Sequence, residues 1–160
     1  MNKNKLIASM LAIAATFSTA HAAQVLGASC PIENNGTSGE TVTHQGVICA
    51  NEKWQDPASL PMTSLRVEEF KSGKQTRSIE QVRALGVRSI VQSSEGQNLF
   101  AVLATVVSIN PDNTAHVVMD LDEGRVNHHV DTTVLLGTPT AVAKGEDGQE
   151  YRLTVRRLGS

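Results

Sequence analysis

Residues 99–158 hold the pattern that decides the fold, namely four apolar-rich runs separated by short turn signals. These runs are LFAVLATVVSI (99–109), TAHVVMDL (114–121), VNHHVDTTV (126–134) and EYRLTVRRL (150–158). In the second run apolar and polar residues alternate, which is typical of a half-buried β-strand. The first run is apolar on both faces, so we expect a central strand that is covered on both sides. Together the runs predict an antiparallel β unit.

The register of the predicted central hairpin follows from its loop, residues 122–125. Four-residue loops are common in hairpins, and this one places Leu121 opposite Val126. On the outer face the same register places His116 beside Asp131. Because a slip of one residue would turn each apolar set to water, the assignment of residues to faces is strongly specified.

The composition favours one domain with a small appendage. The chain has 160 residues, of which 40% are hydrophobic and only 3% aromatic, so the core has to be built from aliphatic side chains. Removing residues 1–22 takes away Lys3 and Lys5 and no acid, which lowers the net charge from −2 to −4. An acidic chain with one Trp and one Tyr has no excess of basic side chains to neutralise phosphates and few aromatic rings to stack on bases, so we expect no nucleic-acid partner.

Residues 1–22 have the pattern of a cleaved signal peptide: a basic start, an apolar run over residues 6–17 and the small-x-small site Ala20-His21-Ala22. The apolar run is too short to cross a hydrocarbon core of roughly 30 Å as a helix. We therefore expect a protein without a membrane span in a bacterial periplasm. Association with the outer membrane and secretion are the alternatives that the sequence leaves open. A competing interpretation is a lipoprotein box at residues 26–30, which would attach Cys30 to lipid and leave Cys49 unpaired.

The exported chain has two cysteines, Cys30 and Cys49, and in an oxidising compartment we expect them to form one disulfide. The closed loop of about 20 residues would contribute about 3 kcal/mol to stability. A redox site would need a closely spaced pair, and a zinc site would need more ligands. Residues 23–61 are thus predicted to be a disulfide-closed segment that ends in a Pro-rich linker.

Residues 62–160 are predicted to be a β-rich domain with one short helix, at residues 79–85. Ser78 and Gln81 have the spacing of a capping box, and Ile79, Val82 and Leu85 form an apolar stripe. We expect this helix to cover the second apolar face of the sheet. The predicted fold class is therefore mainly β (α+β), a small antiparallel sheet or sandwich with one helix and a disulfide-closed N-terminal segment.

The order Cys30, then Gly46-Val47-Ile48-Cys49, then Asn51-Glu52-Lys53-Trp54 resembles the Cys–Trp segment of shufflon-type minor pilins and related pilus-tip proteins. In that family a disulfide loop is followed by a Trp, which singles out Trp54 as a candidate binding residue. Asn51-Glu52 departs from the family's Gly-bearing turn, and residues 1–22 lack a prepilin site. The strand pattern of the C-terminal 60 residues is also similar to β modules of secretin-dependent type IV pilus and secretion systems.

His116, His129 and Asp131 are the remaining candidate binding residues. His116 beside Asp131, with His129 on the diagonal, has the residue types of a metal site, although polar pairs across two strands are the more common arrangement. His128 and His129 are adjacent in one predicted strand and point to opposite faces. We assign no catalytic residue, no metal and no cofactor.

Three functions are consistent with these patterns. The first is a non-enzymatic periplasmic component of a type IV pilus or conjugative secretion assembly, with secretin or pilus subunits as partners. The second is an exported binding or inhibitor module that docks onto an enzyme or host molecule through the loop closed by Cys30 and Cys49. The third is a small hydrolase or metal enzyme, which the lack of an ordered Ser/His/Asp set makes the least favoured.

Overall fold

The computed structural model describes residues 22–95, 98–123, 126–145 and 148–159. Within these ranges the chain is mainly β, and its sheets are antiparallel, which confirms the predicted fold class. The elements in chain order are η1 (Ile32–Asn34), β1 (Ser38–Glu40), β2 (Gly46–Ala50), β3 (Lys53–Gln55), η2 (Pro57–Ser59), β4 (Met62–Lys71), β5 (Lys74–Ala84), β6 (Ser89–Glu95), β7 (Asn98–Ile109), β8 (Thr114–Asp122), β9 (Asn127–Leu135), β10 (Thr140–Lys144) and β11 (Gln149–Leu158).

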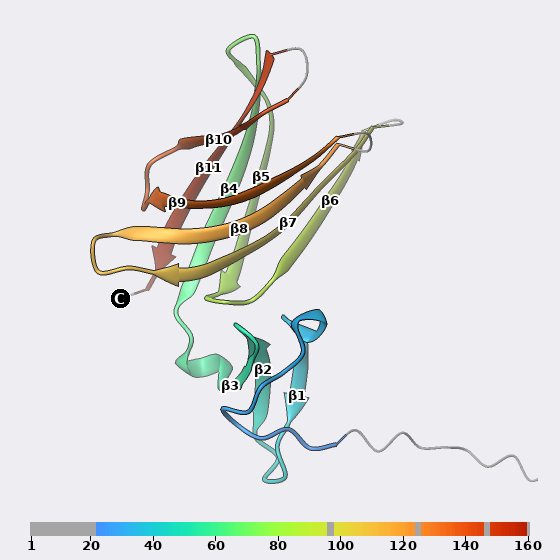
Figure 1. The fold of residues 1–160 in the computed structure, drawn as a ribbon, viewed down its shortest axis with the longest axis vertical. Coiled ribbons are helices and arrows are strands. Elements are labelled where there is room, and N and C mark those ends of the chain that lie inside the picture. Colours follow the sequence, from blue (N-terminus) through green and yellow to red (C-terminus); the bar gives the residue numbers. More distant parts are fainter. Residues whose placement is uncertain (1–21, 96–97, 124–125, 146–147, 160) are drawn as a thin grey trace, which may run out of the picture.

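Two four-stranded sheets pack face to face as a sandwich, and a three-stranded sheet lies at one end of it (Figure 1). The sandwich sheets have the strand orders β10-β11-β4-β5 and β6-β7-β8-β9. The small sheet has the order β1-β2-β3 and belongs to residues 22–61, which we call the disulfide unit. The N-terminal segment thus forms a structure of its own beside the main β domain.

The eight strands of the sandwich follow one another in chain order around a flattened ring. Consecutive strands form ladders, except where the chain passes between sheets, from β5 to β6 and from β9 to β10. β11 pairs with β4 along its whole length, from Gln149↔Lys71 to Leu158↔Met62. The last strand of the chain therefore closes on the first strand of the sandwich, and β10, which follows Pro139, lies at a sheet edge as its proline predicts.

The core lies between the two sheets and consists of the alternate residues predicted to face inward. On β8 these are Ala115, Val117, Met119 and Leu121, all fully buried. Tyr151 and the apolar residues beyond it on β11 face them from the opposite sheet. Complete burial of a medium-sized aliphatic side chain contributes about 1.5–3 kcal/mol, so this alternation is the main determinant of the fold.

The predicted register of the β8–β9 hairpin is wrong by two residues. Leu121 lies opposite His128, not Val126, because the ladder closes at Asp122↔Asn127. A shift of two residues keeps every side chain on its predicted face, since the side-chain period of a strand is two. The inward-facing residues were therefore predicted correctly, although the predicted register was wrong.

The helix predicted at residues 79–85 is not formed, because residues 74–84 are strand β5. Every residue from Lys74 to Ala84 except Thr76 has a partner in the ladder with β4, in which Val67 lies opposite Ile79. The pairing uses backbone groups that a helix would have satisfied locally, and it buries Ile79 in the common core. Tertiary pairing thus overrides the capping signal at Ser78.

The β4–β5 turn explains why this segment pairs as a strand. Ser72 and Gly73 both have positive φ, 51° and 77°, between the paired residues Lys71 and Lys74. Two central residues of positive φ form the two-residue turn whose twist matches that of antiparallel strands. The Ser72-Gly73 dipeptide is therefore a hairpin signal, and the predicted helix at residues 79–85 did not take it into account.

The predicted signal peptide falls almost entirely outside the described residues, which begin at Ala22. Among the residues that are described, no helix has the length and apolarity needed to cross a membrane. The disulfide is compatible with an extracellular or periplasmic location, because such bonds persist in oxidising compartments.

Candidate functional site

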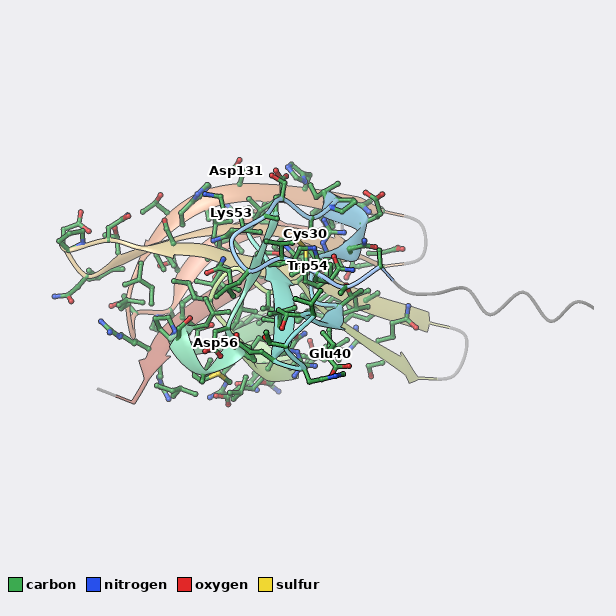
Figure 2. All side chains as sticks on the ribbon, turned by 90° about the horizontal axis from the view of Figure 1, so that it is seen from below. Cys30, Glu40, Lys53, Trp54, Asp56 and Asp131 are labelled. Carbon is green, nitrogen blue, oxygen red and sulfur yellow. A yellow bond between two sulfur atoms is a disulfide. The ribbon has the colours of Figure 1, made fainter. Side chains whose placement is uncertain are left out.

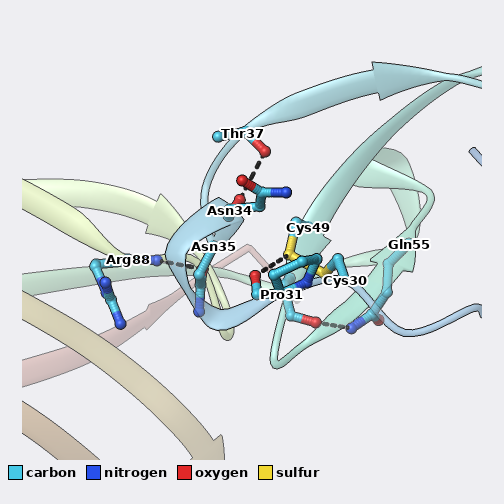
Figure 3. Close-up of a disulfide and its surroundings, with 9 residues drawn as sticks. Cys30, Pro31, Asn34, Asn35, Thr37, Cys49, Gln55 and Arg88 are labelled. Atoms are coloured by element: carbon cyan, nitrogen blue, oxygen red, sulfur yellow. Dashed lines mark hydrogen bonds between the residues drawn. A yellow bond between two sulfur atoms is a disulfide. The ribbon is translucent and has the colours of Figure 1, made fainter. Parts of the chain in front are cut away.

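The predicted disulfide between Cys30 and Cys49 is formed, and it organises the disulfide unit (Figure 3). Both cysteines are buried with Val47 and Trp54 in a small core of their own. Trp54 lies directly opposite Cys49 in the β2–β3 ladder, so its ring packs over the same face of the sheet. The bridge uses the sulfur of Cys30, which excludes the alternative of a lipid on that atom.

Hydrogen bonds that involve two asparagines attach the disulfide unit to the sandwich. The backbone N–H of Arg88 donates to Asn35 Oδ1 at 2.9 Å (Figure 3). The Asn51 N–H donates to the Gly86 carbonyl at 3.0 Å, and Asn51 Nδ2 donates to the Val107 carbonyl at 2.9 Å. Asn51 therefore bridges two separate segments of the sandwich.

A groove of about 540 Å³ lies at this junction, between the disulfide unit and the outer face of β7 and β8. We call it the junction groove. Its aliphatic lining comes from Ile32 on one wall and from Val107 and Val118 on the other, and Arg88 and Glu52 contribute one charge of each sign. Pockets that bind ligands are commonly this large, mainly apolar and placed between domains. The second face of β7, expected to be covered by a helix, thus forms one wall of a groove instead.

The candidate residues His116 and Asp131 do meet, and so do two others. His116 Nε2 lies 2.7 Å from Asp131 Oδ1, although the residue directly opposite His116 is Thr133. His129 Nδ1 lies 2.7 Å from Asp120 Oδ1, a partner that the sequence interpretation missed because of its register. Both pairs are exposed on the outer face of the β6–β9 sheet.

These pairs do not combine into a metal centre. Over the described part of the chain, no group of three or more His, Cys, Asp or Glu side chains is placed to hold a metal ion. In Figure 2 Asp131 lies at the periphery of the view, whereas Cys30 and Trp54 lie in its middle. The histidine and aspartate candidates lie on the outer face of the β6–β9 sheet, whereas Trp54 is buried in the disulfide unit, so the candidates named from the sequence do not form one site.

A polar cluster that the sequence did not reveal lies between the two sheets. Glu69 is buried and accepts a hydrogen bond from Gln149 Nε2 at 3.1 Å, and its other oxygen lies 3.6 Å from Arg77 Nη1. The Arg77 guanidinium lies 4.5 Å from the centre of the Phe100 ring. Glu69 and Arg77 are opposite each other in the β4–β5 ladder, so the correct reading of β5 as a strand would have predicted this ion pair.

Tyr151 is buried beside this cluster, opposite Glu69 in the β11–β4 ladder, and its hydroxyl group is not hydrogen-bonded to any described residue. Its ring stacks with Phe100 at 6.2 Å and lies 5.7 Å from the His128 ring. Among the described residues neither the Tyr151 hydroxyl nor His128 Nε2 has a hydrogen-bond partner. An unpaired buried hydroxyl is costly, so this position lowers the stability of the core.

No protein-family model, curated protein or solved structure matches this chain. The geometry itself indicates what the surface can do. The junction groove offers aliphatic contacts together with the side-chain amides of Asn35 and Asn51, of which Asn35 Oδ1 and Asn51 Nδ2 are already bonded to the sandwich. Aliphatic side chains combined with polar groups are also what protein interfaces contain.

Proposed function

We propose that this protein is a non-enzymatic component of a type IV pilus or conjugative secretion assembly in the bacterial envelope, and that it acts through protein–protein contacts. The observation that carries the proposal is the junction groove. It is concave, it is lined by aliphatic side chains of both units, and Ile32 in its wall is 56% exposed. Aliphatic surface of this kind is stabilised when a partner covers it.

The arrangement of the groove suits a specific partner. On the sandwich wall, Val118 is paired in the β8–β9 ladder, whereas Val107 lies at the bulge between Val106 and Ser108, where its carbonyl accepts the hydrogen bond from Asn51. Its polar lining comes from both units, with Asn35, Asn51 and Glu52 from the disulfide unit and Arg88, Thr105 and Ser108 from the sandwich. Apolar contacts combined with hydrogen-bonding groups are the usual composition of a protein interface.

The resemblance to pilus-tip proteins is the reason for proposing this class of assembly. The resembled segment is a disulfide loop followed by a Trp, and in this chain Trp54 packs with Cys30 and Cys49 in one core. The resemblance therefore involves residues that act together structurally. It supports an envelope partner, such as a secretin or pilus subunit, as the first candidate.

An exported module that inhibits or binds an enzyme or host molecule is the second candidate. The observation that favours it is the position of Ile32, which lies inside the loop closed by the disulfide and projects from its single-turn helix η1. A stapled loop with an exposed aliphatic side chain loses little entropy when it binds.

Site-specific photo-cross-linking in intact cells tests both candidates. A photoreactive residue is placed at Ile32 or Val118 in the groove, and the matched control is Val82, which is 45% exposed on the other sheet. We expect groove positions to cross-link to a pilus or secretin subunit, identified by mass spectrometry, and Val82 not to. A cross-link to an enzyme or host molecule would support the second candidate. If groove and control positions give the same products, the groove is not the binding surface.

A further inference from the structure

At one end of the sandwich, three neighbouring strands carry exposed aliphatic side chains next to one another. Met62 begins β4, and it lies opposite Leu158 at the end of β11 and opposite Ala84 at the end of β5. Val82 lies opposite Ser64, two residues further along β4. The three strand ends lie close together at the lower end of the sandwich (Figure 1). We call the block that they form the arginine patch, and it consists of residues 62–64, 82–84 and 156–158.

The period of the strands shows that these aliphatic side chains point away from the core. The core cluster includes a residue of each strand, namely Leu65, Ile79 and Val155. Side chains alternate between the two faces of a sheet, so the residues three positions from these point outward. The residues at those positions are Met62, Val82 and Leu158, which are 41%, 45% and 36% exposed. They therefore leave apolar surface in water, and covering that surface is favourable.

The arginine patch carries three positive charges and no acid. Its arginines are Arg83, Arg156 and Arg157, and all three are exposed. Arg83 and Arg157 lie on either side of Thr63, each opposite it in one of the two ladders of β4. Arg83 Nη1 donates to the Val82 carbonyl at 3.0 Å. Among the described residues, none of these three arginines forms an ion pair with a carboxylate, so their charge is not compensated within the protein.

The other arginines of the same sheet are each compensated by a glutamate. These ion pairs are Arg66–Glu68, Arg77–Glu69 and Arg152–Glu150. The next acid along β5 from the patch, Glu80, lies opposite Arg66 and accepts a hydrogen bond from the Ser64 hydroxyl at 2.5 Å. The arginines that lack an acid thus coincide with the end of the sheet at which aliphatic side chains are exposed.

We propose that the arginine patch binds the surface of a membrane that contains anionic phospholipid. Guanidinium groups bind phosphate through paired hydrogen bonds, and aliphatic side chains enter the boundary between headgroups and acyl chains. An anionic lipid surface therefore presents the complements of both kinds of side chain next to one another. The sandwich wall of the junction groove belongs to the opposite sheet, so binding through the patch leaves that groove free. The two surfaces are separate, and either proposal can fail while the other stands.

Vesicle binding by the purified protein tests the proposal. The vesicles contain equal parts of phosphatidylglycerol and phosphatidylcholine, and vesicles of phosphatidylcholine alone are the reference. The variant is Arg156→Gln/Arg157→Gln, and the matched control is Lys71→Gln/Lys74→Gln, which removes the same charge at the opposite end of the β4 ladders. We expect the arginine variant to bind the anionic vesicles about thirtyfold more weakly than the wild type, because each basic side chain at such a surface contributes about fivefold. The lysine variant should stay within about threefold of the wild type, because its charges lie far from the lipid.

A second measurement keeps the arginines intact and reports which surface touches the lipid. An environment-sensitive fluorophore is attached through Val82→Cys. The matched control carries the same fluorophore through Leu135→Cys, at a position that is 51% exposed on the other sheet. We expect anionic vesicles to shift the emission of the label at residue 82 to the blue and to leave the label at residue 135 unchanged, because only the patch enters the headgroup region.

The outcomes separate a membrane from other partners. Wild-type protein that binds the two kinds of vesicle equally, or binds neither, would overturn the proposal. Equal losses in the arginine and lysine variants, or equal shifts of the two labels, would overturn it as well. A protein cross-linked to Val82 in cells, together with no binding to the anionic vesicles, would assign the patch to an acidic protein surface instead.

Discussion

Replacing Gly86 by Ala tests whether the disulfide unit is held against the sandwich as described. Gly86 has φ +77° and is buried, and a Cβ there would lie 2.6 Å from Asn51 Cγ and Nδ2. A left-handed conformation costs an Ala about 1 kcal/mol. Moving the Asn51 side chain also breaks its hydrogen bond to the Val107 carbonyl, which contributes about 1 kcal/mol more. We therefore expect Gly86→Ala to lower the free energy of unfolding by about 2 kcal/mol.

The matched control is Gly137→Ala. Gly137 has φ +74°, and a Cβ there would meet nothing within 4 Å, so this variant isolates the conformational cost. Its expected loss is about 1 kcal/mol, half that of Gly86→Ala. Each kcal/mol should lower Tm by about 3 °C for a chain of this size.

The assay is urea denaturation followed by two probes. Circular dichroism reports mainly on the sandwich, whereas the fluorescence of Trp54, the only tryptophan in the sequence, reports on the disulfide unit. In Gly86→Ala we expect the fluorescence transition to move to lower urea than the circular dichroism transition, because the disulfide unit loosens first. Equal losses in the two glycine variants, with coincident transitions in both, would refute the contact between Asn51 and the sandwich.

Three further predictions concern other parts of the chain. Tyr151→Phe should raise the free energy of unfolding by about 1 kcal/mol, because it removes a buried hydroxyl without a partner, and a thermal melt showing a loss would contradict that geometry. Replacing Cys30 and Cys49 by Ala should lower it by about 3 kcal/mol in denaturant titrations, and reduced wild-type protein should match the variant. The pKa of Asp112 is lowered by hydrogen bonds from the Thr114 hydroxyl and backbone N–H, so Thr114→Val should raise that pKa in an NMR titration. Because the folded-state pKa is the lower one, Asp112 favours the folded state above its ordinary pKa of 3.8, and this contribution disappears as the pH falls through the folded value.

The strands of the core could be predicted because burial on one face leaves a two-residue period in the sequence. That period places Ala115 and Met119 inward whichever even register is chosen, and the structure buries both. The predicted helix at residues 79–85 failed because its apolar residues also fit a strand. Ile79 is at an inward position of β5, whereas Val82, counted in the helical stripe, is exposed. The deciding factor is the ladder with β4, which a local pattern does not contain.

For the candidate sites too, contacts between neighbouring strands could be predicted from the sequence, whereas contacts between distant segments could not. The His116–Asp131 contact was predictable because a short loop brings β8 and β9 together. The junction groove could not be predicted, because Asn51 and Val107 are 56 residues apart and no local sequence pattern near either residue indicates their hydrogen bond. Trp54 was identified from its position after Cys49, but its place in a buried core emerged only from the structure.

The ladder between β4 and β11 has a consequence for the order in which the molecule can fold. Synthesis proceeds from the N-terminus, so residues 62–71 are made long before residues 149–158, with which they pair. Until the final strand arrives, the inner edge of β4 has no partner, and pairing over so long a separation is intrinsically slow. The connectivity itself thus makes the pairing of β4 with β11 a late step, so the two four-stranded sheets cannot both be complete until the C-terminal strand has been made.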